Sequence, residues 1–590
     1  MKKFFLLILL FTSSFSFAQN DFLLAENYYR DSEYEKATQL YKKLYDASPF
    51  NTTYLKRLIS CYQETDQFTI AENLLKNSLK SNPKQTFLNV ILGHNYDKQQ
   101  QPEIANSYYK KAIFSIDKQP NYGGFIGSLF KEYNLLDYAI EAYEKSMQKN
   151  VNTNYNFQIA QIYGEKGEFD KMFQFYVDML DKNENYLNTI QRYTSKYISD
   201  DSENENNILF RKALLRKSIS NPKAVWNVLL SWLFAQQKQY SKALVQEKAL
   251  FQRNESNLST IFDLGIIAFN NNDFEASKEC FDFVLETTNS QEEKLSAILY
   301  AIKISVAVKN PETEKQFQDV FKIYGKNKQT LPIQIEYADY LTFQKNDPET
   351  AKNILENALD FAASKFEEAR IKLKLGDILV FTGKFNKALI YFSQIQTQLK
   401  NDELGQQARF KVAQTSYFKG DFTWAKAQLK VLKSSTTQLI ANDAVDLFLI
   451  ITDNEPVDSI PSGLIEYAKA DLLAFQNKNQ KSIEILSEVI TKFKGQPIED
   501  EALFKQGKLF IKQKEYENAI TNFEQVIALN PEGILIDDAY YELAELYNNQ
   551  LNNQEKASEY YQKIIFDYSS SIYLVDARKK YRKLRGDNLN

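Results

Sequence analysis

Histidine and cysteine are almost absent from this chain of 590 residues, and both shortages limit its chemistry. His94 is the only histidine, which excludes a metal site built from several histidines and a relay of two histidines. Cys61 and Cys280 are the only cysteines; they lie far apart and lack the spacing of metal ligands. We expect both to be small buried residues, and we predict neither a metal nor another cofactor.

Glycine and proline are also scarce, with 17 and 12 residues. Because these residues interrupt helices most strongly, their scarcity over such a length predicts a mostly helical chain. The chain has no glycine-rich phosphate loop of the form GxxxxGK[ST], and its nearest stretch, Gly164–Lys171, is predicted to be a turn between helices. Paired acidic residues are common, but their pattern is typical of solvated helix faces. We therefore predict a protein that is not an enzyme and has no catalytic residues.

Long apolar runs are limited to the N-terminus. Residues 1–18 have the features of a signal peptide: two lysines, the apolar run Phe4–Phe11 and then small residues, which predicts cleavage between Ala18 and Gln19. Removal of this segment leaves 70 basic and 76 acidic residues, a net charge of −6. Neither this run nor any other is long enough to span a bilayer comfortably. We expect an exported product that is periplasmic or associated with the outer membrane, with the extracellular space as an alternative.

The sequence contains a residue pattern that repeats many times along the chain. Ala37, Ala71, Ala105 and Ala139 are spaced 34 residues apart, and a large residue follows each alanine four positions later. Two antiparallel helices in one unit need such a small residue where they cross, and large aromatic residues fill the space between neighbouring units. In both period and residue classes the pattern resembles the tetratricopeptide repeat.

The same frame continues along the rest of the chain. Its later centres are Met172, Ala243, Ser277, Ala351, Ala388, Ala425, Ser482, Ala519 and Ala557. The gaps after residues 172 and 277 are each long enough for one further degenerate copy, which gives about fifteen repeats. The resemblance implies an all-α fold, a right-handed solenoid of antiparallel helix pairs. Packing between the pairs also explains the aromatic content of 14%.

Breaks in the frame predict the domain organisation. From Ala425 to Ser482 the step is 57 residues, long enough for an extra helix at 438–454. The predicted parts are the signal peptide 1–18, an N-terminal array of about nine repeats at 19–325, middle repeats with the extra helix at 326–455, a linker at 456–463, C-terminal repeats at 464–570 and a basic capping helix at 571–590.

The resemblance also implies a binding groove. In the repeat family, the groove-facing positions include the fifth, ninth and twelfth of each unit. With Ala37 as position twenty, these positions give a candidate partner groove of Glu26, Tyr29, Lys56, Ser60, Gln63, His94, Asp97, Ser128 and Lys131. Eukaryotic chaperone-binding repeats clamp a terminal carboxylate with asparagine at ninth positions. None of the four ninth positions registered here is asparagine, so this mode of binding is not predicted.

The C-terminus is basic, although the chain as a whole is acidic. Six cations occur in one predicted helix: Arg578, Lys579, Lys580, Arg582, Lys583 and Arg585. Residues 531–570 have a net charge of −6 and residues 571–590 one of +4. We predict that this helix, started by Ser571 and ended by Gly586, caps an acidic last repeat. Contact of the cations with anionic lipid or lipopolysaccharide is the alternative, whereas export and the acidic total disfavour nucleic acid.

About the last 130 residues, among them the segment from Asp537 to Asp587, resemble bacterial envelope repeat proteins. These include the lipoprotein type that helps to assemble outer-membrane β-barrels, the periplasmic partner of the Tol–Pal system and a Bacteroidota-type group of exported repeat proteins. The lipid-bearing cysteine of the lipoprotein type is absent near the cleavage point. The resemblance implies a non-enzymatic scaffold or adaptor that binds other envelope proteins or peptide segments through its concave surface. The alternatives are a carboxylate-based or glycan-directed periplasmic enzyme and a secreted or surface adhesin.

Overall fold

The computed structural model describes residues 21–432, 438–456 and 461–586. These residues form helices, turns and loops without a strand, which confirms the all-α prediction. The predicted signal peptide and its cleavage site between Ala18 and Gln19 lie outside the described residues. Within the described parts of the chain, no helix is both long and apolar enough to cross a membrane.

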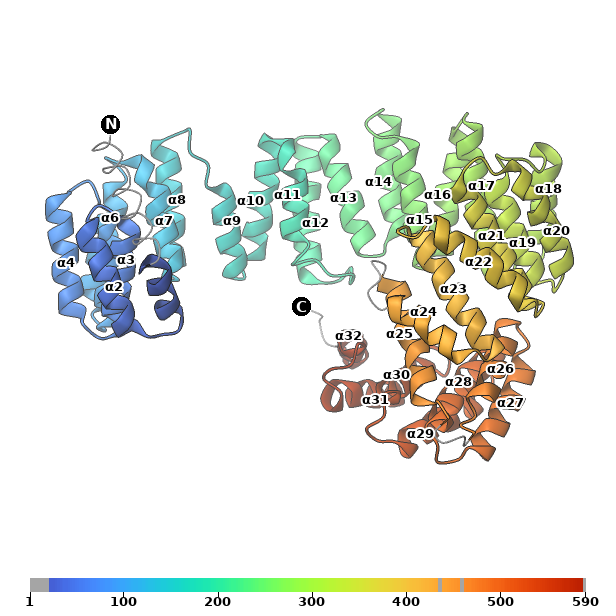
Figure 1. Cartoon of the computed structure of the whole chain (residues 1–590). Helices are drawn as coiled ribbons and strands as arrows, with labels where there is room; N and C mark the ends of the chain where they lie inside the picture. The colour runs from blue at the N-terminus through green and yellow to red at the C-terminus, as the bar shows by residue number, and fades with distance from the viewer. Residues whose placement is uncertain (1–20, 433–437, 457–460, 587–590) are drawn as a thin grey trace, which may run out of the picture. The chain divides into compact units, whose positions relative to one another are not determined.

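The helices follow one another with short connections (Figure 1). After a helix at 21–30, the first half of the array contains α2 (Tyr34–Ala47), α3 (Thr52–Glu64), α4 (Phe68–Ser81), α5 (Leu88–Lys98), α6 (Pro102–Ser115), α7 (Gly123–Glu132), α8 (Leu136–Lys149), α9 (Asn156–Glu165), α10 (Phe169–Lys182), α11 (Leu187–Thr194), α12 (Glu205–Ser220), α13 (Ala224–Gln236), α14 (Tyr240–Gln252), α15 (Leu258–Asn270) and α16 (Phe274–Thr287).

The second half continues in the same way. It contains α17 (Gln291–Ala307), α18 (Thr313–Tyr324), α19 (Leu331–Phe343), α20 (Pro348–Ala358), α21 (Lys365–Phe381), α22 (Phe385–Gln398), α23 (Glu403–Lys419), α24 (Phe422–Leu432), α25 (Gln438–Asp453), α26 (Leu464–Phe475), α27 (Asn479–Lys492), α28 (Ile498–Gln513), α29 (Tyr516–Leu529), α30 (Ile536–Asn549), α31 (Gln554–Asp567) and α32 (Leu574–Arg585). Three short 3-10 helices occur at Pro120–Tyr122, Glu184–Tyr186 and Leu359–Phe361.

The described helices form fifteen pairs, each a first and a second helix, with α25 and α32 outside the pairing. The pairs α11–α12 and α17–α18 are the two degenerate copies expected in the long gaps. The extra helix predicted at 438–454 is α25. We call the face formed by the first helices of the pairs the inner face.

The chain divides into two compact units, which are described separately below. Unit 1 consists of residues 1–199 and 205–229, and unit 2 consists of residues 200–204 and 230–590. The division falls within α13. The boundaries proposed from the sequence at 325, 455 and 570 mark changes in the repeat pattern and stay predictions.

The residue at the centre of each frame lies where the paired helices cross. All thirteen centres that the sequence identified, from Ala37 to Ala557, are completely buried. On the opposing helix the fit is equally close: a Cβ atom added to Gly93 of α5 would lie 2.3 Å from the ring of Tyr109 on α6. The small residues are therefore required by the crossing, and the aromatic rings fill the space that they leave.

A second 34-residue signal lies in the turns within the pairs. Ser32, Asp66, Gln100 and Asn134 all have φ near +60°. One residue in the left-handed region reverses the chain between the first and second helix of these pairs. The residue type varies from pair to pair, so no repeated residue marks this position in the sequence.

Candidate protein-binding surfaces

The inner face of unit 1 is crossed by an ion pair. Lys56 on α3 lies with its Nζ atom 2.8 Å from a carboxylate oxygen of Glu132 on α7. Since α3 belongs to the second pair and α7 to the fourth, these side chains reach over the third pair. Lys56 also lies 6.0 Å from the ring centre of Phe125. The predicted groove position Lys56 therefore lies on the inner face, although it already has a partner.

His94 lies beside this ion pair on the third pair. Its ring stacks on that of Tyr133, with centroids 3.9 Å apart and planes 8° apart. Burial, followed by the positive charge of Lys98, lowers the pKa of His94, so the imidazole is neutral at pH 7. Its ring nitrogens have no hydrogen-bond partner among the described residues. His94 is therefore a half-buried residue of the first helix of its pair, and its place in a partner groove stays a prediction.

Most of the other predicted groove residues have partners inside the chain. Glu26 accepts hydrogen bonds from Arg57 at 2.7 and 2.9 Å and from Tyr41 at 2.6 Å. The hydroxyls of Tyr29 and Ser60 are 2.6 Å apart. These contacts join the first two pairs and leave Glu26, Tyr29 and Ser60 less available to a partner.

Two more predicted groove residues join neighbouring helices, and one lies on the surface. Tyr109 donates a hydrogen bond to Asp97, and Lys131 pairs with Glu165 on α9 at 2.8 Å. Ser128 is exposed, with its hydroxyl donating to the Phe125 carbonyl at 2.9 Å.

The prediction for Gln63 requires a correction. Its side chain is only 4% exposed, and its amide nitrogen donates to Asn95 at 3.3 Å. The register places Gln63 on the first helix correctly, but the adjacent pair covers it. Gln63 is therefore a packing residue between the second and third pairs rather than a groove residue.

Sequence reasoning missed the charged residues next to the predicted positions. Glu64, Lys98 and Glu132 follow at intervals of 34 residues and alternate in sign, and Lys98 pairs with Glu64 at 2.8 Å. Tyr133, the stacking partner of His94, comes directly after Glu132. The alternation of charge at one repeat interval is the signal that would have identified this position.

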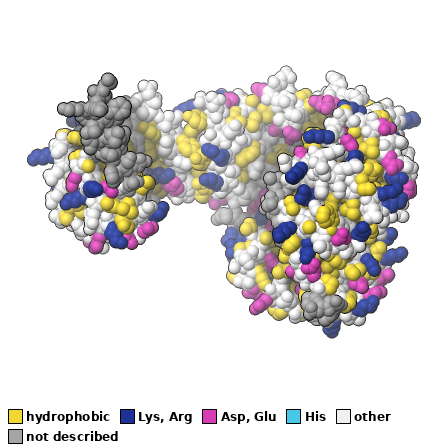
Figure 2. All heavy atoms as spheres, in the orientation of Figure 1, with side chains coloured by type: hydrophobic (Ala, Val, Ile, Leu, Met, Phe, Trp, Pro, Cys, Tyr) yellow, Lys and Arg dark blue, Asp and Glu magenta, His cyan; other side chains and the backbone are white. Residues whose placement is uncertain are grey.

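Similar pairs join the first helices of unit 2. Lys411 on α23 lies 2.9 Å from Asp377 on α21, and Lys505 on α28 lies 2.7 Å from Asp471 on α26. Over the face shown in Figure 2, basic and acidic side chains are interspersed rather than gathered into fields of one sign. The paired charges on the inner face link neighbouring repeats, although such pairs contribute little to stability where they contact solvent.

Part of the inner face of unit 2 is closed by aromatic residues. Phe475 at the end of α26 packs against Phe343 of α19 and Phe418 of α23, with ring centres 5.4 and 5.8 Å apart. The following residue, Gln476, donates to the carbonyl of Phe381 at 2.7 Å, and Asn477 donates to that of Phe343 at 2.7 Å. The thirteenth pair therefore contacts the tenth and eleventh pairs. Its side chains cover the inner face of unit 2 at these contacts.

A polar pocket of about 260 Å³ lies beside this closure, lined by Gln414, Tyr417, Phe418, Leu447, Asp471, Ala474, Phe475, Lys505 and Lys512. Tyr417 donates to Asp471 at 2.8 Å, and Lys505 pairs with the same carboxylate. On the turn of α28 before Lys505, burial and the charge of Asp500 raise the pKa of Glu501 to about 8. Among the described residues no group of acidic, histidine or cysteine side chains has the geometry of a metal site.

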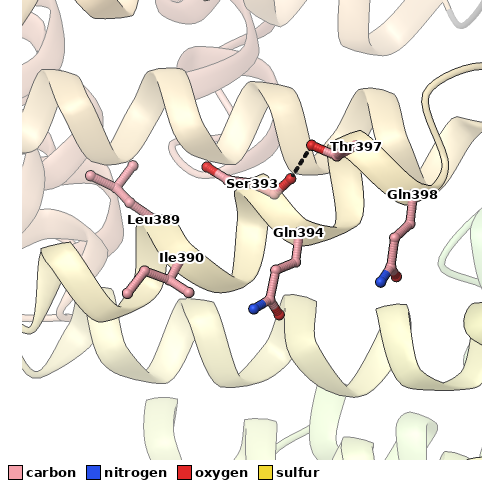
Figure 3. Close-up of a pocket in the computed structure, with 6 residues that line it drawn as sticks. All are labelled: Leu389, Ile390, Ser393, Gln394, Thr397 and Gln398. Carbon is pink, nitrogen blue, oxygen red and sulfur yellow. Dashed lines mark hydrogen bonds between the residues drawn. The ribbon is translucent and has the colours of Figure 1, made fainter.

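A second hollow, of about 540 Å³, lies along the second helix of the eleventh pair (Figure 3). Leu389, Ile390, Ser393, Gln394, Thr397 and Gln398 line it, all from one face of α22. Ile390, Gln394 and Gln398 point to the same side of the helix in Figure 3. This hollow has no ionised side chain and no titratable pair, so it offers no groups for acid–base chemistry.

The basic C-terminal helix contacts the acidic helix α30, the first helix of the last pair. Lys580 of α32 lies 2.6 Å from Glu545 of α30, and Tyr573 donates to Asp538 at 2.7 Å. Ala577 is completely buried in the cluster below, where Tyr581 and Leu584 also pack. The helix ends at Gly586 with φ of 77°, as predicted. It begins at Leu574 rather than directly after Ser571, whose hydroxyl instead accepts from the Tyr573 amide at 3.1 Å.

The geometry defines a class of protein, an all-α solenoid of stacked helix pairs. The family model of the tetratricopeptide repeat matches residues 501–533 and 538–571, which contain most of α28 to α31. The fourteenth and fifteenth pairs therefore match the tetratricopeptide repeat.

The chain is also similar to other known proteins. A TPR repeat-containing protein, MJ1428 from Methanocaldococcus jannaschii, is 22% identical over 335 residues, which cover 48% of this chain and 59% of that protein. This chain thus spans less than two thirds of the relative's length. Two solved structures align over 96% of both chains: Naa15/Naa10 bound to HypK-THB, with a TM-score of 0.32 and 10% identity, and the APC/C hetero-tetramer Cut9-Hcn1, with a TM-score of 0.25 and 12% identity. These low scores support no inference about partners.

Proposed function

We propose that this chain is an exported, non-enzymatic scaffold or adaptor of the bacterial cell envelope. It binds segments of other envelope proteins along the inner face of unit 1. The observation that supports this most directly is the surface around His94, where neutral ring nitrogens without a partner lie beside the Lys56–Glu132 ion pair. Export is supported by the sequence of residues 1–18, and the envelope by the resemblance of residues 537–587 to envelope repeat proteins.

The inner face offers recognition rather than catalysis. A partner segment would meet the imidazole of His94, the exposed hydroxyl of Ser128 and ion pairs at Lys56 and Lys131 that exchange partners at little cost, because pairs in contact with solvent contribute little. In unit 2 the aromatic closure around Phe475 occupies the equivalent face. Unit 1 is therefore the better candidate for a protein partner.

The test is site-directed crosslinking in intact cells. A photoreactive phenylalanine analogue placed at Ser128, on the inner face of α7, is expected to give discrete protein adducts identified by mass spectrometry. The matched control places the same analogue at Glu141, which is exposed on the second helix of the same pair. Combined substitution of Lys56, His94 and Lys131 by alanine is expected to abolish the adducts without changing the helical circular dichroism. Equal adducts from both sites, or adducts that survive the triple substitution, would argue against this face.

Export has its own test. The mature protein is expected in the envelope fraction, with Gln19 as its N-terminal residue by mass spectrometry. Recovery of the uncleaved chain in the cytoplasm would contradict the envelope assignment. It would not by itself contradict protein binding by the inner face.

A further inference from the structure

The C-terminal end of unit 2 exposes large apolar side chains. Phe566, Ile572 and Val575 are 68%, 85% and 78% exposed, and they flank the turn between α31 and α32. The last element of a solenoid normally covers the apolar core and presents a polar outer face. Here the core is covered, because Ala577 is completely buried, yet the outer surface keeps three large apolar groups.

The outer face of α32 also carries cations without partners. Val575, Arg578 and Arg582 follow at intervals of three and four residues and so lie along one stripe of the helix. Arg578, Arg582 and Lys583 are exposed, and none has an ion-pair partner among the described residues. The stripe lies opposite Ala577 and Leu584, which pack inward.

Docking of the helix does not use these outer cations. Lys580 supplies the inward charge, at 2.6 Å from Glu545 and 2.8 Å from Asp576, and Lys579 contacts Asp200. The Tyr541 hydroxyl donates to Asp576 at 2.6 Å. The inner and outer sides of α32 thus have separate roles, one in packing and one that no contact within the described chain explains.

We propose that the outer face of α32, together with Phe566 and Ile572, is a docking surface for an anionic lipid membrane. Protruding apolar side chains beside unpaired arginine and lysine residues are typical of helices that lie in the membrane interface. The apolar groups enter the boundary between headgroups and acyl chains, while the cations meet lipid phosphates. An acidic protein is the alternative partner for the cations, but it would need a pocket for each of the three protruding apolar side chains. A lipid membrane accepts them without such pockets and is therefore the favoured partner.

This proposal rests on the proposed location in the cell envelope, because that location supplies the membrane. It adds a lipid surface to the partners of the proposed function. The test uses purified mature chain, residues 19–590, and co-sedimentation with phosphatidylcholine vesicles with or without about 30% phosphatidylglycerol. We expect binding to the anionic vesicles and little binding to the neutral ones. Absence of binding to anionic vesicles would overturn this proposal and leave the crosslinking result at Ser128 unaffected.

Three combined variants separate the contributions. One replaces Arg578, Arg582 and Lys583 by glutamine, and one replaces Phe566, Ile572 and Val575 by serine. The control replaces Lys400, Lys430 and Lys494, exposed elsewhere in unit 2, by glutamine and changes the net charge equally. Both C-terminal variants are expected to lose affinity for anionic vesicles by at least about tenfold, and the control to keep it.

Three outcomes of these experiments would contradict the proposal. Equal losses in the cation variant and its control would mean general electrostatic adsorption. Unchanged binding by the serine variant would mean that no apolar insertion occurs. If the wild type ignores vesicles but binds poly-glutamate through Arg578 and Arg582, the partner is an acidic chain. Unfolding midpoints equal to the wild-type value show that both C-terminal variants remain folded.

Discussion

Side chains at the crossings of paired helices decide whether a pair forms. Gly93 is the clearest case, because Tyr109 occupies the space that a Cβ atom would need. Gly93→Ala is expected to lower the free energy of unfolding by about 1–3 kcal/mol through overpacking. Urea unfolding followed by circular dichroism measures this loss. Ser128→Ala, on the exposed side of the first helix in the next pair, serves as the control and is expected to change stability by less than about 0.5 kcal/mol.

Glu501 makes stability depend on pH. Burial raises its pKa to about 8 from an ordinary value of 4.5, so the folded chain favours the protonated carboxyl. The stability that this group contributes is complete below about pH 4.5 and is lost as the pH rises to about 8. Glu501→Gln keeps the neutral form at every pH. The variant is expected to match the wild type near pH 5 and to exceed its unfolding free energy near pH 8 by about 1–3 kcal/mol.

Urea unfolding at several pH values measures the effect at Glu501. Glu517→Gln, at an exposed position on α29, is the matched control and is expected to leave the pH dependence unchanged. A pH profile that is the same for Glu501→Gln and the wild type would show that the Glu501 carboxyl is ionised at no cost in the folded chain.

Among whole elements, the aromatic part of the contact between α26 and the earlier first helices centres on Phe475, next to the hydrogen bonds of Gln476 and Asn477. Phe475→Ala removes the ring that packs on Phe343 and Phe418. The expected loss is about 1–3 kcal/mol, measured by urea unfolding. Phe566→Ala removes an identical but exposed ring and is expected to change stability by less than about 0.5 kcal/mol. Equal effects of the two substitutions would contradict the closure.

The helix α32 acts as a cap on the core of unit 2. Deletion of residues 571–590 uncovers Tyr561 and Ile564, which are completely buried in the intact chain. The thermal midpoint is expected to fall, with a loss on the order of 3 kcal/mol, and limited proteolysis is expected to cut within the last pairs. Lys580→Gln removes only the inward ion pairs and is expected to cost about 1 kcal/mol, less at high salt. Unchanged midpoint and proteolysis after the deletion would contradict the cap.

For the whole molecule, stability is local because each pair contacts few others. In such arrays neighbouring repeats unfold together and distant repeats unfold independently. Gly93→Ala is therefore expected to reduce hydrogen-exchange protection in α3 to α8 and to leave α28 to α31 unchanged. Exchange measured by mass spectrometry at several urea concentrations tests this. A uniform loss of protection in both units would mean that the chain unfolds as a single cooperative body.

Positions fixed by contacts within one repeat could be predicted from the sequence alone. The 34-residue frame identified all thirteen buried crossing residues, the two degenerate pairs and the extra helix α25, because helix crossings depend on residue size at a fixed spacing. The same frame placed His94 on the inner face. The basic capping helix followed from the apolar stripe between Leu574 and Leu584 and the charge contrast with residues 531–570.

Contacts between distant repeats were decided only by the tertiary structure. No spacing in the sequence indicates that Phe475 reaches Phe343, that Lys56 reaches Glu132, or that the neighbouring pair covers Gln63. Each depends on small rotations that accumulate from pair to pair, and side-chain periodicity does not encode their sum. For the same reason the sequence predicted the cations of α32 but not which face each occupies: packing turned Lys580 inward, and it left Arg578 and Arg582 exposed beside Val575.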